Sequence, residues 1–306
     1  MTPKHYNTHY HDVSTCRENR PLKPAQFTYH APKTVDEAVA KLAKLGPLDG
    51  RILAGGQSLV PMMAFRIARP AHLIDINNVA GFDRLAVDDN VLSIAPCVRH
   101  AAFHRPAITG PTGALLVDVV RYIAHYPIRL RGTFCGSLAH ADPASEWCLT
   151  AVTLGAELVV LSSRGRRTIA ADDYFQGMMT TTLAEDELIT EVRVPLLSEN
   201  ARFGFDEFNR RAGDYALAMA LATFCLRDGV IVEPRVGLGG AEARPRRIAK
   251  AEAVLAGQEP SVEVFDAAGE AAASAVDPLE DVHADAEFRR DLVRTVTQRA
   301  LARAAT

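Results

Sequence analysis

The chain has 306 residues, of which 48% are hydrophobic and 23% are charged, and its formal net charge is −3. This is the composition of an ordinary folded protein with room for two or three domains. No basic stripe gives electrostatic support for nucleic-acid binding, and no apolar run approaches the roughly 18 residues that cross a bilayer.

The first twenty residues contain several His, Tyr and charged residues and lack the apolar centre of a signal peptide. We therefore expect residues 1–22 to form a flexible extension and the protein to be cytoplasmic. The cysteines are Cys16, Cys97, Cys135, Cys148 and Cys225. Their number is odd and no two share the spacing of a metal clip, so we expect free thiols rather than disulfides, zinc or an iron–sulfur cluster.

The first predicted element after this extension is a helix. Thr34 and Glu37 form a Thr-x-x-Glu capping box, and apolar residues then recur at helical spacing until Gly46. A short strand over Arg51–Ala54 ends abruptly at two glycines, and a helix-like segment leads to a second strand over His72–Ile76. The predicted order is therefore strand, glycine turn, helix, strand.

The middle of the chain is predicted to contain a hairpin, a helix and a loop. Residues 84–96 form the hairpin, with Asp89-Asn90 at its turn. Apolar spacing predicts a helix over Ala114–His125, which Pro127 ends. The stretch Arg131–Glu146 is polar and contains glycine, so a loop is predicted there.

The remaining elements are a helix near Trp147–Leu154 and strands over Glu157–Leu161, Leu188–Val194, Ala218–Arg227 and Val230–Leu238. Asp228-Gly229 is a turn sequence that joins the last two strands into a hairpin. From Arg247 onward the pattern is helical and amphipathic. A change in composition places a domain boundary at about residue 199.

Two segments suggest a ligand site. The first, Ala54–Ser58, has two adjacent glycines directly after a strand. Glycines allow a tight turn in which successive backbone N–H groups point at one anion, and Ser58 adds a hydroxyl donor. A pyrophosphate would suit this arrangement, although a purely structural Gly-Gly turn also fits the segment.

The second segment, Thr133–Ser137, again combines hydroxyls with small residues, and Asp142 and Glu146 follow it. A carboxylate suits a ribose because it accepts hydrogen bonds from sugar hydroxyls. The alternative for Asp142 is a helix cap, since Asp142-Pro143 fits an N-cap followed by a first-turn proline. Neither segment is a G-x-G-x-x-G or a P-loop, so a Rossmann site is not supported.

Over roughly residues 24–304 the sequence resembles the FAD-binding medium subunits of the xanthine dehydrogenase and aerobic carbon monoxide dehydrogenase family. Each of the motifs that carry this resemblance is moderately specific, and their common order is strongly so. They are Ile52–Leu59, Leu73–Ile76, Arg129–Ser137 with Ala141–Pro143, Asp186–Pro195 and Arg210–Ala216.

The resemblance implies an α+β protein with an FAD-binding fold of the vanillyl-alcohol-oxidase/p-cresol-methylhydroxylase type. Residues 23–198 would form the FAD-binding domain, with α/β subdomains at about 23–78 and 79–198. Residues 199–306 would form a C-terminal α+β domain of a β-sheet and helices that covers the flavin and docks partners. Non-covalent FAD is the cofactor implied for this chain.

The resemblance also implies which residues contact FAD. The two loops would hold its pyrophosphate, Glu146 would be an acidic contact, Ile189 would meet the flavin, and Tyr215 would lie near the isoalloxazine or else in the core. The full set is Ile52, Leu53, Ala54, Gly55, Gly56, Gln57, Ser58, Leu59, Thr133, Phe134, Cys135, Gly136, Ser137, Asp142, Glu146, Ile189 and Tyr215.

The sequence departs from the family pattern at three positions. Cys135 replaces a glycine of the second loop and would be strained if it needed a positive φ, and Ser137 replaces an Asn or Asp. Carbon monoxide dehydrogenases typically carry His where Gln57 stands, which favours an organic substrate. His140 lies in the second loop, but the family generally does not attach FAD covalently.

The implied function is that of the FAD subunit of a heterotrimeric molybdenum hydroxylase or dehydrogenase, arranged as a dimer of heterotrimers. A large molybdopterin subunit would oxidise an N-heterocyclic or aldehyde substrate, and a small subunit would pass electrons through [2Fe–2S] clusters. FAD would deliver them to NAD, a quinone or another acceptor. A stand-alone FAD oxidoreductase and a scaffold that has lost FAD are the alternatives.

Overall fold

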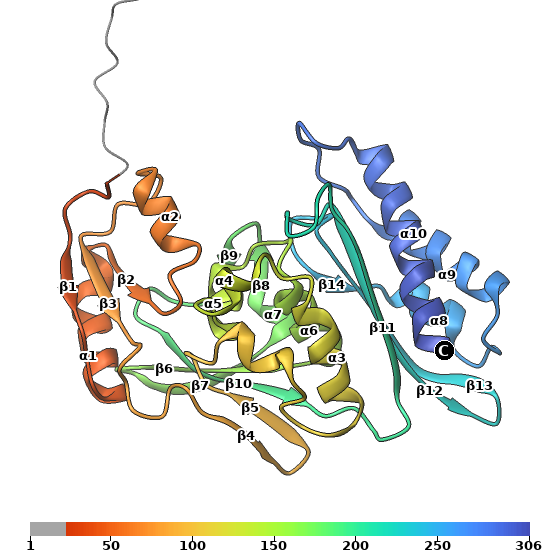
Figure 1. Ribbon diagram of the computed structural model, residues 1–306, viewed down its shortest axis with the longest axis horizontal. Helices are drawn as coiled ribbons and strands as arrows, with labels where there is room; N and C mark the ends of the chain where they lie inside the picture. Colours follow the sequence, from red (N-terminus) through yellow and green to blue (C-terminus); the bar gives the residue numbers. More distant parts are fainter. Residues whose placement is uncertain (1–22) are drawn as a thin grey trace, which may run out of the picture.

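The computed structural model describes residues 23–306, so the extension predicted at residues 1–22 lies outside the described residues. Three larger sheets follow one another along the molecule, each accompanied by helices (Figure 1). The first is parallel and the other two are antiparallel. The α+β class is confirmed.

The first sheet has the order β1 (Thr28–His30), β3 (His72–Asp75), β2 (Gly50–Leu53). Its parallel pairs require crossover connections, which α1 (Val35–Leu45) and α2 (Leu59–Ala64) provide. Thr34 caps α1 by accepting a hydrogen bond from the backbone N–H of Glu37 at 3.2 Å, as its capping box predicts. The apolar face of α1 packs against the sheet in one core cluster.

The central sheet has the order β4 (Leu85–Asp88), β5 (Val91–Ile94), β10 (Leu188–Pro195), β6 (Glu157–Ser162), β7 (Gly165–Ala170). The predicted hairpin at its edge is confirmed. Asp89 and Asn90 have φ values of 45° and 62°, the left-handed conformations that a two-residue type I′ turn needs.

Helices and short elements lie between the central and third sheets. The longer helices are α3 (Gly110–Val120) and α6 (Glu146–Leu154), and the shorter elements are η2 (His100–His104), α4 (Tyr126–Arg129), α5 (Phe134–His140), α7 (Ala171–Tyr174), β8 (Phe175–Gly177) and β9 (Thr180–Thr181). All of them except α4 and β9 contribute residues to one hydrophobic core that they share with both neighbouring sheets.

Two sequence predictions in this region are wrong. The helix predicted over Ala114–His125 runs instead over Gly110–Val120, because Pro111 occupies its first turn and Ala124 has a positive φ of 39°. Pro127 does not end this helix. It lies in the first turn of the short helix α4. The loop predicted over Arg131–Glu146 contains α5, which Thr133 caps.

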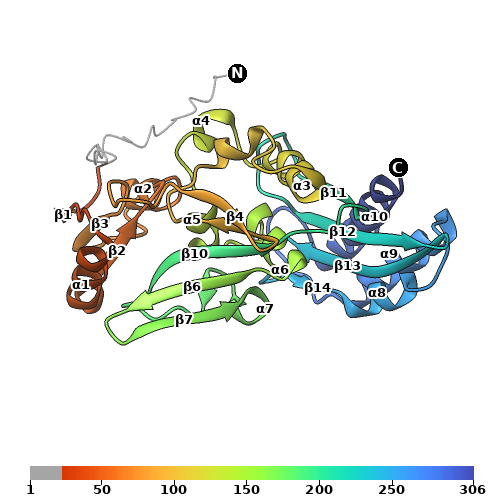
Figure 2. The same cartoon turned by 90° about the horizontal axis from the view of Figure 1, so that it is seen from below.

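The third sheet has the order β11 (Arg202–Phe208), β12 (Ala218–Arg227), β13 (Val230–Gly239), β14 (Arg246–Arg247). Figure 2 shows α8 (Ala249–Leu255), α9 (Val262–Ala275) and α10 (Ala286–Ala305) against it. The hairpin and C-terminal helices are as predicted, whereas β11 was not foreseen.

Strand β12 is buried on both faces, and its side chains alternate between two cores. Met219 and Leu221 belong to the cluster shared with α3 and α6. Ala218, Ala220 and Ala222 belong to the cluster formed with α8, α9 and α10. This strand therefore joins the C-terminal region to the middle of the molecule. No helix within residues 23–306 is long and apolar enough to cross a membrane.

Candidate functional site

The two glycine-bearing segments meet in space, at Gly55 of the first and at Arg131 and Gly132, which directly precede Thr133 and are counted with the second segment from here on. A Cβ on Gly55 would lie 2.7 Å from the Cα of Gly132 and closer still to the carbonyl oxygen of Arg131. Gly56 has a φ of +73°, which few L side chains adopt. Both glycines are therefore required by the backbone, the first for close approach and the second for its conformation.

The first segment presents backbone N–H groups that are free to bind a ligand. Among the described residues, none of the N–H groups from Gly55 to Ser58 donates to a protein acceptor. Their carbonyls are held in place, since Gln57 Nε2 donates to Gly55 O at 3.1 Å and Asn77 Nδ2 to Ala54 O at 2.8 Å. Consecutive free N–H groups of this kind form an anion-binding concavity.

The second segment is held by a side-chain cap and by two backbone hydrogen bonds to the chain around residues 98–100. Thr133 Oγ1 accepts a hydrogen bond from Gly136 N at 3.0 Å and so caps α5. On the outer side, His100 N donates to Gly132 O at 3.0 Å and Phe134 N donates to Val98 O at 3.1 Å. The segment is thus a capped helical turn anchored to the chain before η2.

Cys135 lies within α5, and its φ is not positive. The strain that a left-handed conformation would cause is therefore absent. Its buried thiol donates to Ile94 O at 3.5 Å, and burial raises the pKa of this thiol. Cys135 is consequently a core residue that packs α5 on the central sheet.

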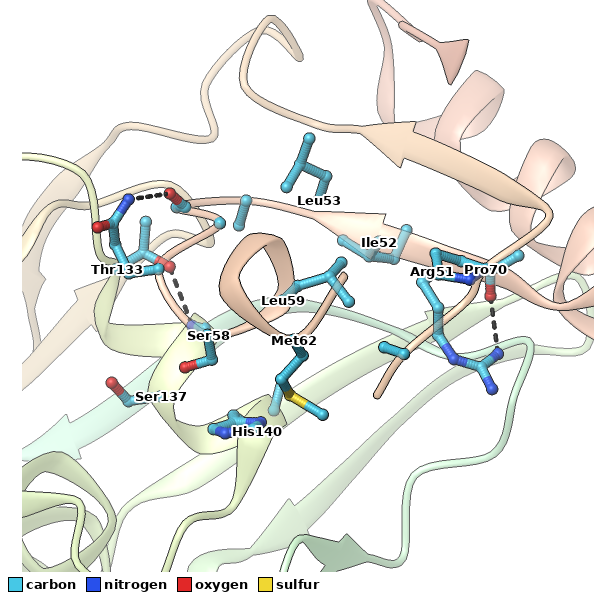
Figure 3. Close-up of a pocket in the computed structure, with 18 of the residues that line it drawn as sticks. Arg51, Ile52, Leu53, Ser58, Leu59, Met62, Pro70, Thr133, Ser137 and His140 are labelled. Atoms are coloured by element: carbon cyan, nitrogen blue, oxygen red, sulfur yellow. Dashed lines mark hydrogen bonds between the residues drawn. The ribbon is translucent and has the colours of Figure 1, made fainter. Parts of the chain in front are cut away.

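The two segments line a cleft of about 860 Å³. The side chains of Ser58, Thr133 and Ser137 gather at one end with His140, and Ile52 and Leu59 lie further along (Figure 3). The predicted site residues in this cleft are Ile52, Leu53, Ala54, Gly55, Gly56, Gln57, Ser58, Leu59, Thr133, Gly136 and Ser137.

The other predicted residues lie elsewhere. Phe134, Cys135 and Ile189 are buried in the core shared by the central and third sheets. Asp142 and Tyr215 line a second cleft of about 530 Å³. The core alternative for Tyr215 is wrong, because 71% of its surface is exposed.

Glu146, the residue that the resemblance implies as an acidic FAD contact, begins α6 and is buried. Burial raises its pKa, the nearby Asp142 carboxylate raises it further, and Arg129 opposes the shift. Asp142 does not cap α6, whose N-cap residue is Ser145; its Oδ1 instead accepts a hydrogen bond from Ala144 N at 2.9 Å. The helix-cap alternative for Asp142 is therefore wrong.

Several cleft residues were not identified from the sequence. They include Met62, the segment 66–70, His100, His140, Thr181 and the segment 183–185. His100 is the most distinctive, because it is buried and its Nδ1 accepts a hydrogen bond from Trp147 Nε1 at 2.9 Å. No local sequence pattern marks this histidine, since its partner lies 47 residues away.

Comparison with known proteins identifies the family. Residues 25–197 match the FAD binding domain in molybdopterin dehydrogenase, and residues 203–304 match the CO dehydrogenase flavoprotein C-terminal domain. The chain belongs to the molybdopterin dehydrogenase FAD-binding family. It is therefore an oxidoreductase chain with FAD as its cofactor, and the family's molybdenum and iron–sulfur centres belong to other subunits.

Members of this family align along almost the whole chain. The chain is 40% identical to the nicotine 6-hydroxylase medium subunit of Paenarthrobacter nicotinovorans over 92% of its own length and 99% of that protein. A carbon monoxide dehydrogenase structure from Hydrogenophaga pseudoflava superimposes with a TM-score of 0.88 at 34% identity, covering 92% of this chain and 98% of that one. The structure of quinoline 2-oxidoreductase from Pseudomonas putida 86 superimposes with a TM-score of 0.86 at 36% sequence identity, again covering 92% of this chain and 98% of that one. These matches confirm the predicted FAD-binding fold.

The cleft suits the cofactor of this family. The glycine crossing leaves no side chain between the two segments, and the free N–H groups and hydroxyls there suit a diphosphate. Within residues 23–306, no group of three or more His, Cys, Asp or Glu side chains could hold a metal ion.

Proposed function

We propose that this chain binds FAD across its two glycine-bearing segments and serves as the electron-transfer subunit of a heterotrimeric molybdenum hydroxylase. The observation that carries the proposal is the crossing of Gly55 with Gly132 at the floor of the larger cleft. Such a crossing explains why side chains are missing where a diphosphate would approach the backbone.

In this proposal each part of the site has a distinct task. The N–H groups of residues 55–58 and the hydroxyls of Ser58 and Ser137 would hold the diphosphate. Asp142 and Glu146 would face the ribose or flavin end, and Tyr215 in the second cleft would cover the isoalloxazine. Ile189 and Cys135 would support the site from the core.

The chain supplies binding and orientation rather than acid–base chemistry. Bound FAD would supply the redox chemistry, accepting electrons from [2Fe–2S] clusters of a small subunit and releasing them to NAD, a quinone or oxygen. The region 199–306 would cover the flavin and dock the partner chains. We propose a cytoplasmic dimer of heterotrimers, and the free thiols of Cys97, Cys135, Cys148 and Cys225 are consistent with a reducing compartment.

We propose an N-heterocyclic substrate for the large subunit. Two of the relatives above act in nicotine and quinoline oxidation by their names, and their sequence identities to this chain, 40% and 36%, exceed the 34% of the carbon monoxide dehydrogenase structure. Gln57 supports the same choice, since His is typical of carbon monoxide dehydrogenases at this position.

Anaerobic reduction of the flavin tests the proposal. The chain would be purified alone and also co-expressed with its large and small partner subunits, and each preparation would be mixed with an N-heterocycle such as nicotine or quinoline. We expect bleaching of the flavin absorbance only in the three-subunit complex. Bleaching by the isolated chain would instead support a stand-alone oxidoreductase.

A further inference from the structure

His100 lies where the two glycine-bearing segments meet. It is 4% exposed, yet it contributes to the wall of the larger cleft. A Cβ on Gly132 would lie 2.5 Å from His100 Nε2, so this nitrogen lies directly against the backbone of the second segment. Gly132 is the residue that Gly55 approaches, which places the imidazole beside the crossing.

The tautomer of this imidazole is fixed by its partner. Trp147 is fully buried, and its Nε1–H donates to His100 Nδ1 at 2.9 Å. An indole nitrogen can only donate, so Nδ1 must carry a lone pair, and in a neutral ring the proton is then on Nε2. Burial, reinforced by Arg129 and Arg99, lowers the pKa of His100 to about 3, which keeps the ring neutral.

The Nε2–H donor has no acceptor of its own. Within the described part of the chain, no carbonyl, carboxylate or hydroxyl accepts from it, and Gly132 offers no side chain. Nε2 is not among the fully enclosed polar atoms of the described residues that lack a partner, so this donor opens onto the cleft, where an acceptor from a ligand can replace water. A fixed N–H at this place favours a ligand atom that accepts hydrogen bonds, such as a phosphate oxygen.

We propose that His100 is a neutral hydrogen-bond donor to a diphosphate oxygen in the larger cleft and that Trp147 is its positioning residue. This assignment rests on the proposed FAD site. His100 binds through Nε2, and Trp147 acts only by keeping the proton on that nitrogen.

The test uses the full chain stripped of flavin, with FAD and inorganic pyrophosphate as separate probes. His100→Leu removes the donor, His100→Gln keeps an N–H near the Nε2 position, and Trp147→Phe removes the tautomer lock. His104→Gln, four residues along the same short helix η2, is the matched control. Affinity would be measured by quenching of flavin fluorescence, with pyrophosphate as competitor, and folding by the thermal midpoint.

We expect His100→Leu to weaken FAD and pyrophosphate binding by about tenfold to a hundredfold, since the lost bond joins an N–H to a charged oxygen. His100→Gln and His104→Gln should bind nearly as well as the wild type, and Trp147→Phe should fall between. Wild-type affinity in a folded His100→Leu variant would overturn the assignment. A wild-type chain that binds neither probe would overturn the proposed function itself.

A measurement on the unmodified chain covers the case in which His100→Leu does not fold. The ¹⁵N spectrum of the imidazole should show the Nε2–H tautomer, and the Nε2 resonance should move when pyrophosphate or FAD is added. A proton on Nδ1, or an Nε2 resonance that both ligands leave unchanged, would contradict the assignment.

Discussion

At the residue scale, Gly55 controls whether the two glycine-bearing segments can meet. In a Gly55→Ala variant the new Cβ would overlap the backbone of Arg131 and Gly132. Overpacking of this kind costs about 1–3 kcal/mol, so FAD affinity should fall by roughly tenfold or more. Equilibrium titration of the flavin-free chain with FAD measures the effect.

Gly177→Ala is the matched control for this variant. The nearest atom to a Cβ there is Thr180 Cβ at 4.0 Å, and Gly177 does not have a positive φ. We expect it to bind FAD as the wild type does. Full FAD retention by Gly55→Ala would show that the crossing does not support the diphosphate.

The carboxyl group of Glu207 should make the free energy of unfolding depend on pH. Its Oε2 is buried without a hydrogen-bond partner, and burial and the nearby Glu146 raise its pKa. Because the folded-state pKa is raised above 4.5, the folded chain binds more protons than the unfolded chain above that pH. This contribution to stability is present below 4.5 and is lost as the pH rises through the folded-state pKa.

As the pH rises from about 5 to about 8, the free energy of unfolding should therefore fall less for Glu207→Gln than for the wild type. The difference should grow by about 1.4 kcal/mol per pH unit, because in this range Glu207 is protonated in the folded chain and ionised in the unfolded chain. The amide keeps an oxygen that can accept from Asn209 Nδ2. Urea unfolding at several pH values measures the difference, with the exposed Glu259→Gln as control. Parallel pH profiles for wild type and Glu207→Gln would refute the assignment.

Short sequence patterns identified the glycines of the cleft wall, but they did not identify the buried His100. Gly55 and Gly56 were identifiable because adjacent glycines directly after a strand indicate a tight turn or a close backbone approach. His100 was not, since its role depends on Trp147 and on a loop more than thirty residues away. Contacts between distant segments leave no local pattern in one sequence.

At the element scale, the cap of α5 links the stability of the fold to the site. Thr133 is 2% exposed, and its hydroxyl accepts the N–H of Gly136. Thr133→Ala should lower the free energy of unfolding by about 0.5–2 kcal/mol, and it should also weaken FAD binding because the second segment loosens. Thr133→Ser keeps the hydroxyl and should restore both properties.

Urea unfolding and FAD titration of the two Thr133 variants provide the check. Equal losses in Thr133→Ala and Thr133→Ser would point to the methyl group rather than the cap. An unchanged Thr133→Ala would show that α5 does not depend on this hydrogen bond.

Tertiary packing explains why the sequence failed to predict α5. The residues of α5 include glycine and serine, which disfavour a helix in isolation, but Thr133 caps the turn and Phe134, Cys135 and Leu138 are buried. Strong local signals, such as the turns at Asp89-Asn90 and Asp228-Gly229, predicted their hairpins correctly. Weak segments are decided by tertiary packing instead.

At the scale of the whole molecule, the third sheet packs on the middle of the chain through a shared core. Phe205, Met219 and Leu221 from β11 and β12 lie in the same cluster as the helices beside the cleft. The two clefts are therefore lined by parts of one packed body, and the second cleft is lined both by Tyr215, from the turn before β12, and by Asp142, from the turn before α6.

We propose that FAD binds non-covalently across the crossing of Gly55 with Gly132. The most direct measurement is the flavin content of the purified full chain, before and after denaturation, with added FAD where the preparation is initially pale. We expect a visible flavin absorbance band and the release of intact FAD, in proportion to protein, into the supernatant. A chain that stays colourless with excess FAD, or that keeps its flavin attached after denaturation, would contradict it.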